Sequence, residues 1–182
     1  MAKNKHNQTK RLFLALWPDD ATRRQVHELQ QSLKYDAGLT TAKPVDENHL
    51  HITLHFLGAV HEQVVPVLKQ ALENVSSTAF EIELDRLGYF AKPGILWMGC
   101  TDYPDALNVL HKTMGQVVRK CLTGYQQKKL VPHVTLFRKA IQLPQKESID
   151  NISWKVESFI LVESKTYAEG VQYRVLQQWP LN

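Results

Sequence analysis

A four-residue pattern, His-x-Thr-Leu, occurs twice in this chain of 182 residues. The first copy is HITL at residues 51–54, and the second is HVTL at residues 133–136, 82 positions later. Each copy combines β-branched and aliphatic residues in the way that is typical of strands. Two copies at this distance do not form a solenoid, and they predict two pseudo-equivalent halves that face each other.

The elements expected around the two copies follow the same order in each half. Alternating apolar residues between turn signals predict strands, and apolar residues at helical spacing predict helices. We expect strands at 11–17, 49–57, 80–90, 95–100, 133–138, 154–163 and 172–178, and helices at about 21–35, 63–75 and 104–122. The strand at 49–57 is expected to stop at Gly58. The series strand–helix–strand–(helix)–strand is thus expected twice.

This order predicts an α+β fold with two pseudo-symmetric lobes. Each lobe is expected to be an antiparallel-type sheet with flanking helices, with the active site in the cleft between the lobes. Because no Gly/Ser-rich linker or charge run separates the halves, we expect one domain over 1–182, with the repeat at about 11–90 and 95–178. Residues 1–10 carry Lys3, Lys5 and Lys10 and are expected to form a flexible basic tail.

Side chains alternate between the faces of a strand, so each copy presents a histidine and a threonine together. His51 shares its face with Thr53, and His133 shares its face with Thr135. Hydrolysis of a cyclic phosphodiester needs a base that takes a proton from water and an acid that protonates the departing ribose oxygen. Histidine, with an unperturbed pKa of about 6.5, serves either role near neutrality, and threonine hydroxyls donate to phosphoryl oxygens. The repeat therefore predicts a metal-independent phosphoesterase site, without saying which histidine is the acid.

Two other functions fit parts of the sequence. His49, His51 and His55 share strand parity, and a His-x-His strand face is a known zinc-binding arrangement, which would indicate a metal-assisted hydrolase. That set lacks an obvious carboxylate ligand and leaves the second copy unexplained. A non-catalytic protein that binds RNA ends would also use basic charge and aromatic side chains. Such a protein has no need of an acid–base pair, and both histidines and both threonines are intact.

Further segments complete a known pattern. They are RLFLAL at 11–16, HITLHFLG at 51–58, HVTLFRK at 133–139, and Glu163-Ser164, Gly170 and Tyr173 near the C-terminus. Over nearly its whole length the chain resembles the 2H phosphoesterases, and specifically the bacterial and archaeal RNA 2′,3′-cyclic phosphodiesterases, also called 2′-5′ RNA ligases. The resemblance implies hydrolysis of 2′,3′-cyclic ends to 2′-phosphomonoesters, and a reverse reaction that joins RNA halves through a 2′-5′ linkage.

The resemblance also implies roles for individual residues. The acid–base pair is His51 and His133, and the phosphate-binding residues are Thr53, Thr135 and Arg138. Phe13 and Phe56 match aromatic positions that border the nucleotide in relatives. Strict alternation along the strands puts Arg138 and Phe56 on the face opposite the histidines, so Arg138 reaches the cleft only if its strand twists or bulges. For Phe13 and Phe56, packing in the core behind the strand is an equal alternative.

The rest of the sequence bears on partners and location. A net charge of +4 suits an anionic partner, and the resemblance implies RNA with 2′,3′-cyclic phosphate or 2′-phosphate ends, tRNA fragments among them. We expect no cofactor, no metal and a monomer. No apolar run approaches about 20 residues, and the first eleven residues lack the apolar core of a secretory signal, so we expect a cytoplasmic protein without a membrane partner. Cys100 and Cys121 are expected to be buried free thiols.

Overall fold

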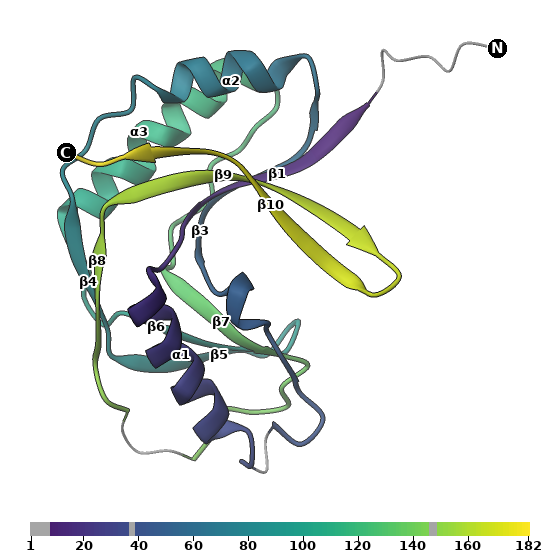
Figure 1. The fold of residues 1–182 in the computed structure, drawn as a ribbon, viewed down its shortest axis with the longest axis vertical. Coiled ribbons are helices and arrows are strands. Elements are labelled where there is room, and N and C mark those ends of the chain that lie inside the picture. The colour runs from purple at the N-terminus through teal and green to yellow at the C-terminus, as the bar shows by residue number, and fades with distance from the viewer. Residues whose placement is uncertain (1–7, 37–38, 146–148) are drawn as a thin grey trace.

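The computed structural model describes residues 8–36, 39–145 and 149–182 (Figure 1). Its main sheet has the strand order β10-β9-β1-β3-β7-β6-β5, with the short β2 paired to β7. The strands of this sheet are β1 (Thr9–Leu16), β2 (Lys43–Pro44), β3 (Ile52–His61), β5 (Arg86–Phe90), β6 (Ile95–Gly99), β7 (His133–Arg138), β9 (Ser158–Tyr167) and β10 (Gly170–Pro180). A second, two-stranded sheet contains β4 (Phe80–Leu84) and β8 (Ile152–Val156).

The main sheet is built from two groups of strands that meet at its centre. The first motif lies at the start of β3, which pairs with β1, and the second lies in β7, which pairs with β6. All paired strands are antiparallel. β3 meets β7 at one residue pair, Ile52 with Val134, and both side chains are buried. The predicted α+β fold with antiparallel sheets is confirmed.

Within the described residues, three α-helices pack on these sheets: α1 (Asp20–Leu33), α2 (Val64–Leu72) and α3 (Asp105–Cys121). Asp19 caps α1, because its carboxylate accepts hydrogen bonds from the backbone N–H groups of Ala21 and Thr22. α2 and α3 lie side by side, and α1 lies apart from them toward the other end of the view (Figure 1). The two longer helices bury apolar stripes that include Val26 in α1 and Leu110 in α3.

Two expected strands are each divided between the two sheets. The segment 80–90 breaks at Asp85, so that β4 pairs with β8 while β5 pairs with β6. The Asp85 N–H donates to the Gly99 carbonyl, and its carboxylate accepts from the Thr101 N–H at 2.7 Å. The segment 154–163 likewise ends β8 and begins β9. The breaks were not predicted, because apolar residues continue beyond both of them and no glycine or proline lies at residues 84–86 or 156–158. Alternate burial is confined to β4 and β8, whereas β9 is buried at residues 159–163 in succession.

The first motif strand differs from its predicted bounds at both ends. His49 lies in a short 3-10 helix, η3 (Glu47–His49), and the strand starts at Ile52. It continues past Gly58, which has a φ of 71° and still pairs with Leu12. Leu57, just before the glycine, has no partner in β1. Gly58 therefore accommodates a β-bulge, and the strand continues beyond it.

Several smaller expectations can be compared with the structure. β1 already begins at Thr9, so Lys10 belongs to the strand and forms an ion pair with Glu62 at 3.3 Å. Lys3 and Lys5 lie outside the described residues. Both cysteines are free thiols, and Cys100 is buried as predicted, whereas Cys121 at the end of α3 is only partly buried. Within the described ranges, none of the helices combines the length and the apolar character needed to cross a membrane.

Candidate active site

His51 lies immediately before β3, and the backbone fixes the orientation of its ring. Its Nδ1–H donates to the carbonyl oxygen of His49 at 2.6 Å. Because a carbonyl only accepts, the proton of the neutral ring is on Nδ1, and Nε2 is the basic atom. Nε2 lies 3.1 Å from Oγ1 of Thr53, whose hydroxyl donates to it. The first motif therefore presents a basic nitrogen beside a hydroxyl.

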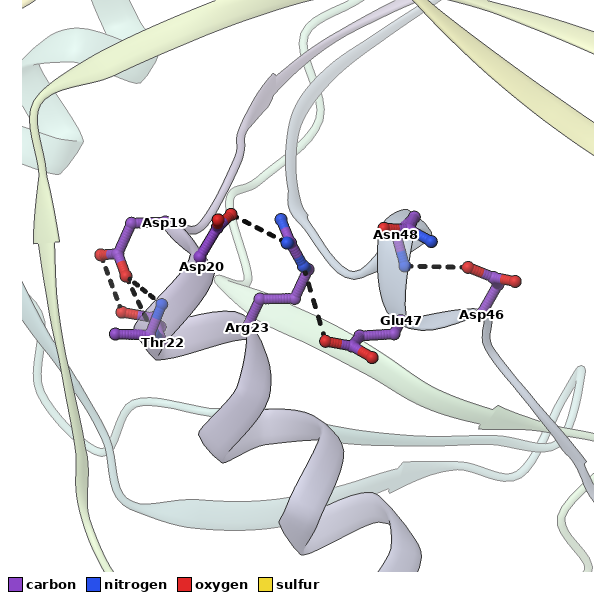
Figure 2. Close-up of polar contacts among 8 residues, drawn as sticks. Asp19, Asp20, Thr22, Arg23, Asp46, Glu47 and Asn48 are labelled. Carbon is purple, nitrogen blue, oxygen red and sulfur yellow. Dashed lines mark hydrogen bonds and ion pairs between the residues drawn. The ribbon is translucent and has the colours of Figure 1, made fainter.

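The carbonyl that orients His51 belongs to η3, and side chains of α1 hold η3 in place (Figure 2). The Arg23 guanidinium bridges two carboxylates: Nη2 is 2.8 Å from Oδ1 of Asp20, and Nε is 3.7 Å from Oε1 of Glu47. The Asp46 carboxylate caps the short helix by accepting from a backbone N–H two residues later, at 2.8 Å. These contacts tie the start of α1 to the turn that precedes the first motif.

His133, the first residue of β7, has the same backbone hydrogen bond. Its Nδ1–H donates to the carbonyl oxygen of Val131, also at 2.6 Å, so its Nε2 is again the basic atom. In both motifs the acceptor is the carbonyl two residues before the histidine. The His133 ring packs against Phe90 and Trp97, with centroid separations of 5.2 and 5.8 Å. The two histidines thus share one backbone setting but have different side-chain neighbours.

Both motif strands contain a bulge directly after the threonine. Leu54 in β3 has no partner in β1, and Leu136 in β7 has no partner in β6. An extra residue shifts the alternation of all residues beyond it by one position. The expectation from strict alternation was therefore wrong, because the bulges turn Phe56 and Arg138 toward the face of the histidines.

Each bulge is supported by a buried polar side chain from a helix of the other half. Gln30 of α1 donates its Nε2–H to the Leu136 carbonyl at 2.7 Å and to the Val45 carbonyl at 2.9 Å. His111 of α3 donates to the Leu54 carbonyl. Gln30 and His111 are 1% and 7% exposed, and buried polar groups of this kind are retained where they satisfy backbone atoms. Their separation of 81 residues is close to that of the motifs, so the support is part of the repeat.

The two motifs meet across the centre of the sheet. Because Ile52 and Val134 are antiparallel partners, the residues next to them, Thr53 and His133, are neighbours across the strands. Thr53, His133 and Phe56 line the same pocket, which has a volume of about 240 Å³. A hydroxyl of the first motif and an imidazole of the second therefore border one space.

The electrostatics of the site couple the two motifs. The pKa of His51 is lowered to about 4, chiefly by burial. The hydrogen bond to the His49 carbonyl opposes this shift, and the charge of Arg138, with that of His133 when it is protonated, adds to it. Burial also lowers the pKa of His133. The effect of one charge on another falls with distance, so Arg138 lies near His51 on the face to which the bulge turns it. Both imidazoles are neutral near pH 7 in the free protein.

Aromatic side chains enclose the ring of His51. Trp17 stacks on it, with a centroid separation of 5.3 Å and an interplanar angle of 7°. Phe13 lies 5.0 Å away, and Tyr173 lies 5.4 Å away edge-on. Phe13 is 4% exposed, whereas Phe56, 6.4 Å beyond it, is 63% exposed. Phe13 is thus packed against the histidine, and Phe56 offers an open ring at the edge of the pocket.

Three aromatic residues that contact the histidines were not predicted: Trp17, Phe90 and Trp97. The internal repeat could have predicted one of them. Trp97 pairs with Thr135 as Ala15 pairs with Thr53, and the two positions differ by the motif separation of 82 residues. A position-by-position comparison of the two halves therefore locates Trp97 beside the second motif.

The three histidines of the alternative zinc face do not converge. His49 is in η3, and its ring packs on Tyr173 at 4.5 Å. His55 is 2% exposed and turns away from His51, donating Nε2–H to the His111 carbonyl at 2.9 Å. In residues 8–36, 39–145 and 149–182, no group of three or more His, Cys, Asp or Glu side chains is arranged to hold a metal ion. The prediction that these histidines share one face was wrong, because the bulge at Leu54 turns the His55 side chain to the opposite face of β3.

Comparisons with known proteins agree with this geometry. Residues 16–97 match the family model described as LigT like Phosphoesterase. A relative from Archaeoglobus fulgidus named RNA 2′,3′-cyclic phosphodiesterase is 28% identical over 160 residues, covering 86% of this chain and 88% of the relative. A relative of the same name from Escherichia coli K12 is 25% identical over 179 residues, covering 96% and 98%. The crystal structure of E. coli LigT in apo form superposes with a TM-score of 0.86 at 25% identity, covering 97% of this chain and 99% of that chain.

Proposed function

Because the chain belongs to the LigT-like phosphoesterases of the 2H superfamily, we propose that it hydrolyses the 2′,3′-cyclic phosphate at the end of an RNA to a 2′-phosphomonoester. The names of its relatives support this reaction. The observation that carries it in this chain is the matched pair of imidazoles. His51 and His133 each present a basic Nε2, because each Nδ1–H is bound to a backbone carbonyl.

The reaction uses the two imidazoles in opposite protonation states. One neutral Nε2 takes a proton from water while the water oxygen attacks phosphorus. The bond between phosphorus and the ribose 3′ oxygen breaks, and the other histidine, protonated on Nε2, donates its proton to that oxygen. The product carries a phosphate on the 2′ oxygen, and exchange of protons with solvent resets the pair. No metal is needed for this sequence of proton transfers.

We propose that the phosphoryl oxygens are bound by Thr53, Thr135 and Arg138. Hydrogen bonds from hydroxyl groups and from a guanidinium stabilise the negative charge that develops on phosphorus-bound oxygens in the transition state. The anionic ligand also offsets the charge of Arg138, which in the free protein lowers the pKa of His51. Binding of the substrate therefore favours protonation of one histidine, as an acid–base pair requires.

Phe13 and Phe56 are proposed to border the nucleotide that carries the cyclic phosphate. The exposed ring of Phe56 supports direct contact with a base, and Phe13 lies between Phe56 and His51. A ribose 5′-hydroxyl in the position of the attacking water would react in the same way and give a 2′-5′ linkage, which is the proposed ligation. tRNA fragments with 2′,3′-cyclic ends are candidate substrates for both reactions.

The proposal is tested with an RNA oligonucleotide that ends in a 2′,3′-cyclic phosphate, incubated with the protein in EDTA. Mapping of the product should find a 2′-phosphate, and activity should persist in the chelator, because the proton transfers use side chains alone. A 3′-phosphate would mean that the other ribose oxygen leaves. Activity that is lost in EDTA and restored by zinc would contradict the metal-independent mechanism, and tight binding of the RNA without turnover would favour a non-catalytic RNA-end binder.

A further inference from the structure

The loop after α3 forms a ridge between two hollows on the surface. One hollow is the pocket that Thr53 and His133 line, and the second is lined by the same loop and by residues of α3 such as Arg119. Lys128, Lys129 and Leu130 line both hollows. The two hollows are therefore adjoining, and their shared wall carries two lysine side chains.

The ridge is held in position by the stacked rings of His55 and His111, whose centroids are 4.3 Å apart. The Tyr125 hydroxyl donates to Nδ1 of His55, and the Gln127 amide donates to Nδ1 of His111 at 3.0 Å. Burial lowers the pKa of both histidines, so both rings are neutral and their Nδ1 atoms accept. Two residues of the loop are thus fixed just before the lysines, which limits the conformational freedom that a ligand must remove.

The electrostatic character of the ridge is uniformly positive. Arg119 of α3 lines the second hollow beside Lys128 and Lys129. In the part of the chain that the structure describes, no Asp or Glu lines either hollow. Among the described residues, none of these three cations has a carboxylate within 4 Å. Unpaired cations grouped in this way attract a ligand that carries several negative charges along its length.

Resting on the proposed function, we infer that Lys128, Lys129 and Arg119 form a binding subsite for the phosphodiester backbone of the RNA strand that leads to the cyclic end. The terminal cyclic phosphate lies at the histidines, and the preceding phosphates cross the ridge from the first hollow into the second. This subsite makes the protein select oligonucleotide ends over free cyclic mononucleotides, because a mononucleotide has no phosphate that reaches the ridge.

The test is a binding measurement that does not depend on turnover. Fluorescence anisotropy gives Kd for single-stranded RNA of one, two, four and eight nucleotides with a 2′-phosphate end, at several salt concentrations. The variant K128A/K129A removes two charges from the ridge. The matched control K112A/K120A removes two charges from exposed positions of α3 that line neither hollow. R119A separately tests the second hollow.

For the wild type and the control, Kd should fall as the RNA lengthens. In K128A/K129A most of this length dependence should disappear, octanucleotide binding should weaken about tenfold, and the slope of log K against log salt should decrease by about 1.4, since each single-strand phosphate contact contributes about 0.7. R119A should weaken binding of the eight-nucleotide RNA more than that of the two-nucleotide RNA. Wild-type length dependence in K128A/K129A, or an equal loss in the control, would overturn the subsite. RNA binding with these effects but without hydrolysis would refute the proposed function and leave the subsite standing.

Discussion

Ile52 of β3 and Val134 of β7 are direct antiparallel partners, and each immediately follows the histidine of its motif. A pair of equivalent residues opposite each other defines a local pseudo-two-fold relation between the strands. It makes the threonine of one motif the neighbour of the histidine of the other, as the pocket shared by Thr53 and His133 illustrates. One strand element used twice thus brings two imidazoles and two hydroxyls to a single site.

The bulge in β7 turns Arg138 toward the face of the histidines, and its charge contributes to the lowered pKa of His51. In R138Q the pKa of His51 should therefore rise above its value of about 4 in the free protein. Loss of one transition-state donor should lower kcat by about 100- to 1,000-fold. NMR titration of the His51 ring and steady-state kinetics measure the two effects.

The neighbouring exposed cation, Lys139, provides a matched control, because K139Q removes the same charge one residue further along. K139Q should leave the titration of His51 and kcat close to those of the wild type. If both variants shift the pKa of His51 equally, the effect belongs to the general field of the protein and not to a guanidinium in the cleft.

The amide of Gln30 links α1 to the bulge of β7 through two backbone carbonyls. Q30M keeps a side chain of similar size and removes the donor, leaving buried carbonyl groups with fewer partners. The free energy of unfolding should fall by about 1–3 kcal/mol, and KM should rise because Arg138 is no longer held at the cleft. Urea unfolding and kinetics measure both. Q31M, at the adjacent exposed position, should change neither quantity, and an unaffected Q30M would show that the bulge is stable without the helix.

The buried ring of His55 makes folding sensitive to acid. Burial lowers its pKa from 6.5 to about 4, so the unfolded chain binds a proton more readily than the folded chain between these values. The stabilisation is complete above about pH 6.5 and is lost as the pH falls toward 4. From pH 7.5 to pH 5 this one residue should reduce the free energy of unfolding by about 2 kcal/mol.

Urea unfolding of the wild type and of H55Q at the two pH values isolates this contribution. H55Q should be less stable at pH 7.5, because it loses the bonds to Tyr125 and to the His111 carbonyl. Between pH 7.5 and pH 5, the free energy of unfolding of H55Q should fall by about 2 kcal/mol less than that of the wild type. An identical pH dependence in both proteins would assign the acid sensitivity to other groups.

Much of the architecture could be predicted from the sequence, because the two motif strands and their flanking helices have clear periodicity. β7 begins and ends at the predicted residues, and α1 and α3 agree within two residues. The changes of sheet at Asp85 and between β8 and β9 could not be predicted, since apolar residues continue beyond both positions and no glycine or proline marks either change.

The site was harder to predict than the fold because of the two bulges. Leu54 and Leu136 are ordinary strand residues, and nothing in the sequence marks them as bulges. Each nevertheless changes the face to which the side chains that directly follow it point. Strict alternation therefore puts Arg138 and Phe56 on the wrong face, and a bulge of the kind that Arg138 was predicted to need turns it toward the histidines. The supports of the bulges, Gln30 and His111, come from distant helices, and the pattern of a single helix does not show which strand it will cover.

The central claim is that His51 and His133 act as one acid–base pair, and the most direct measurement is kcat for H51A, H133A and the double variant on an RNA with a 2′,3′-cyclic phosphate end. Because the two groups act in the same step, each single substitution should lower kcat by about 1,000-fold or more, and the double variant should lose little beyond that. Circular dichroism should show that all three variants are folded. Substantial activity in either single variant, or losses that simply multiply in the double variant, would contradict the paired mechanism.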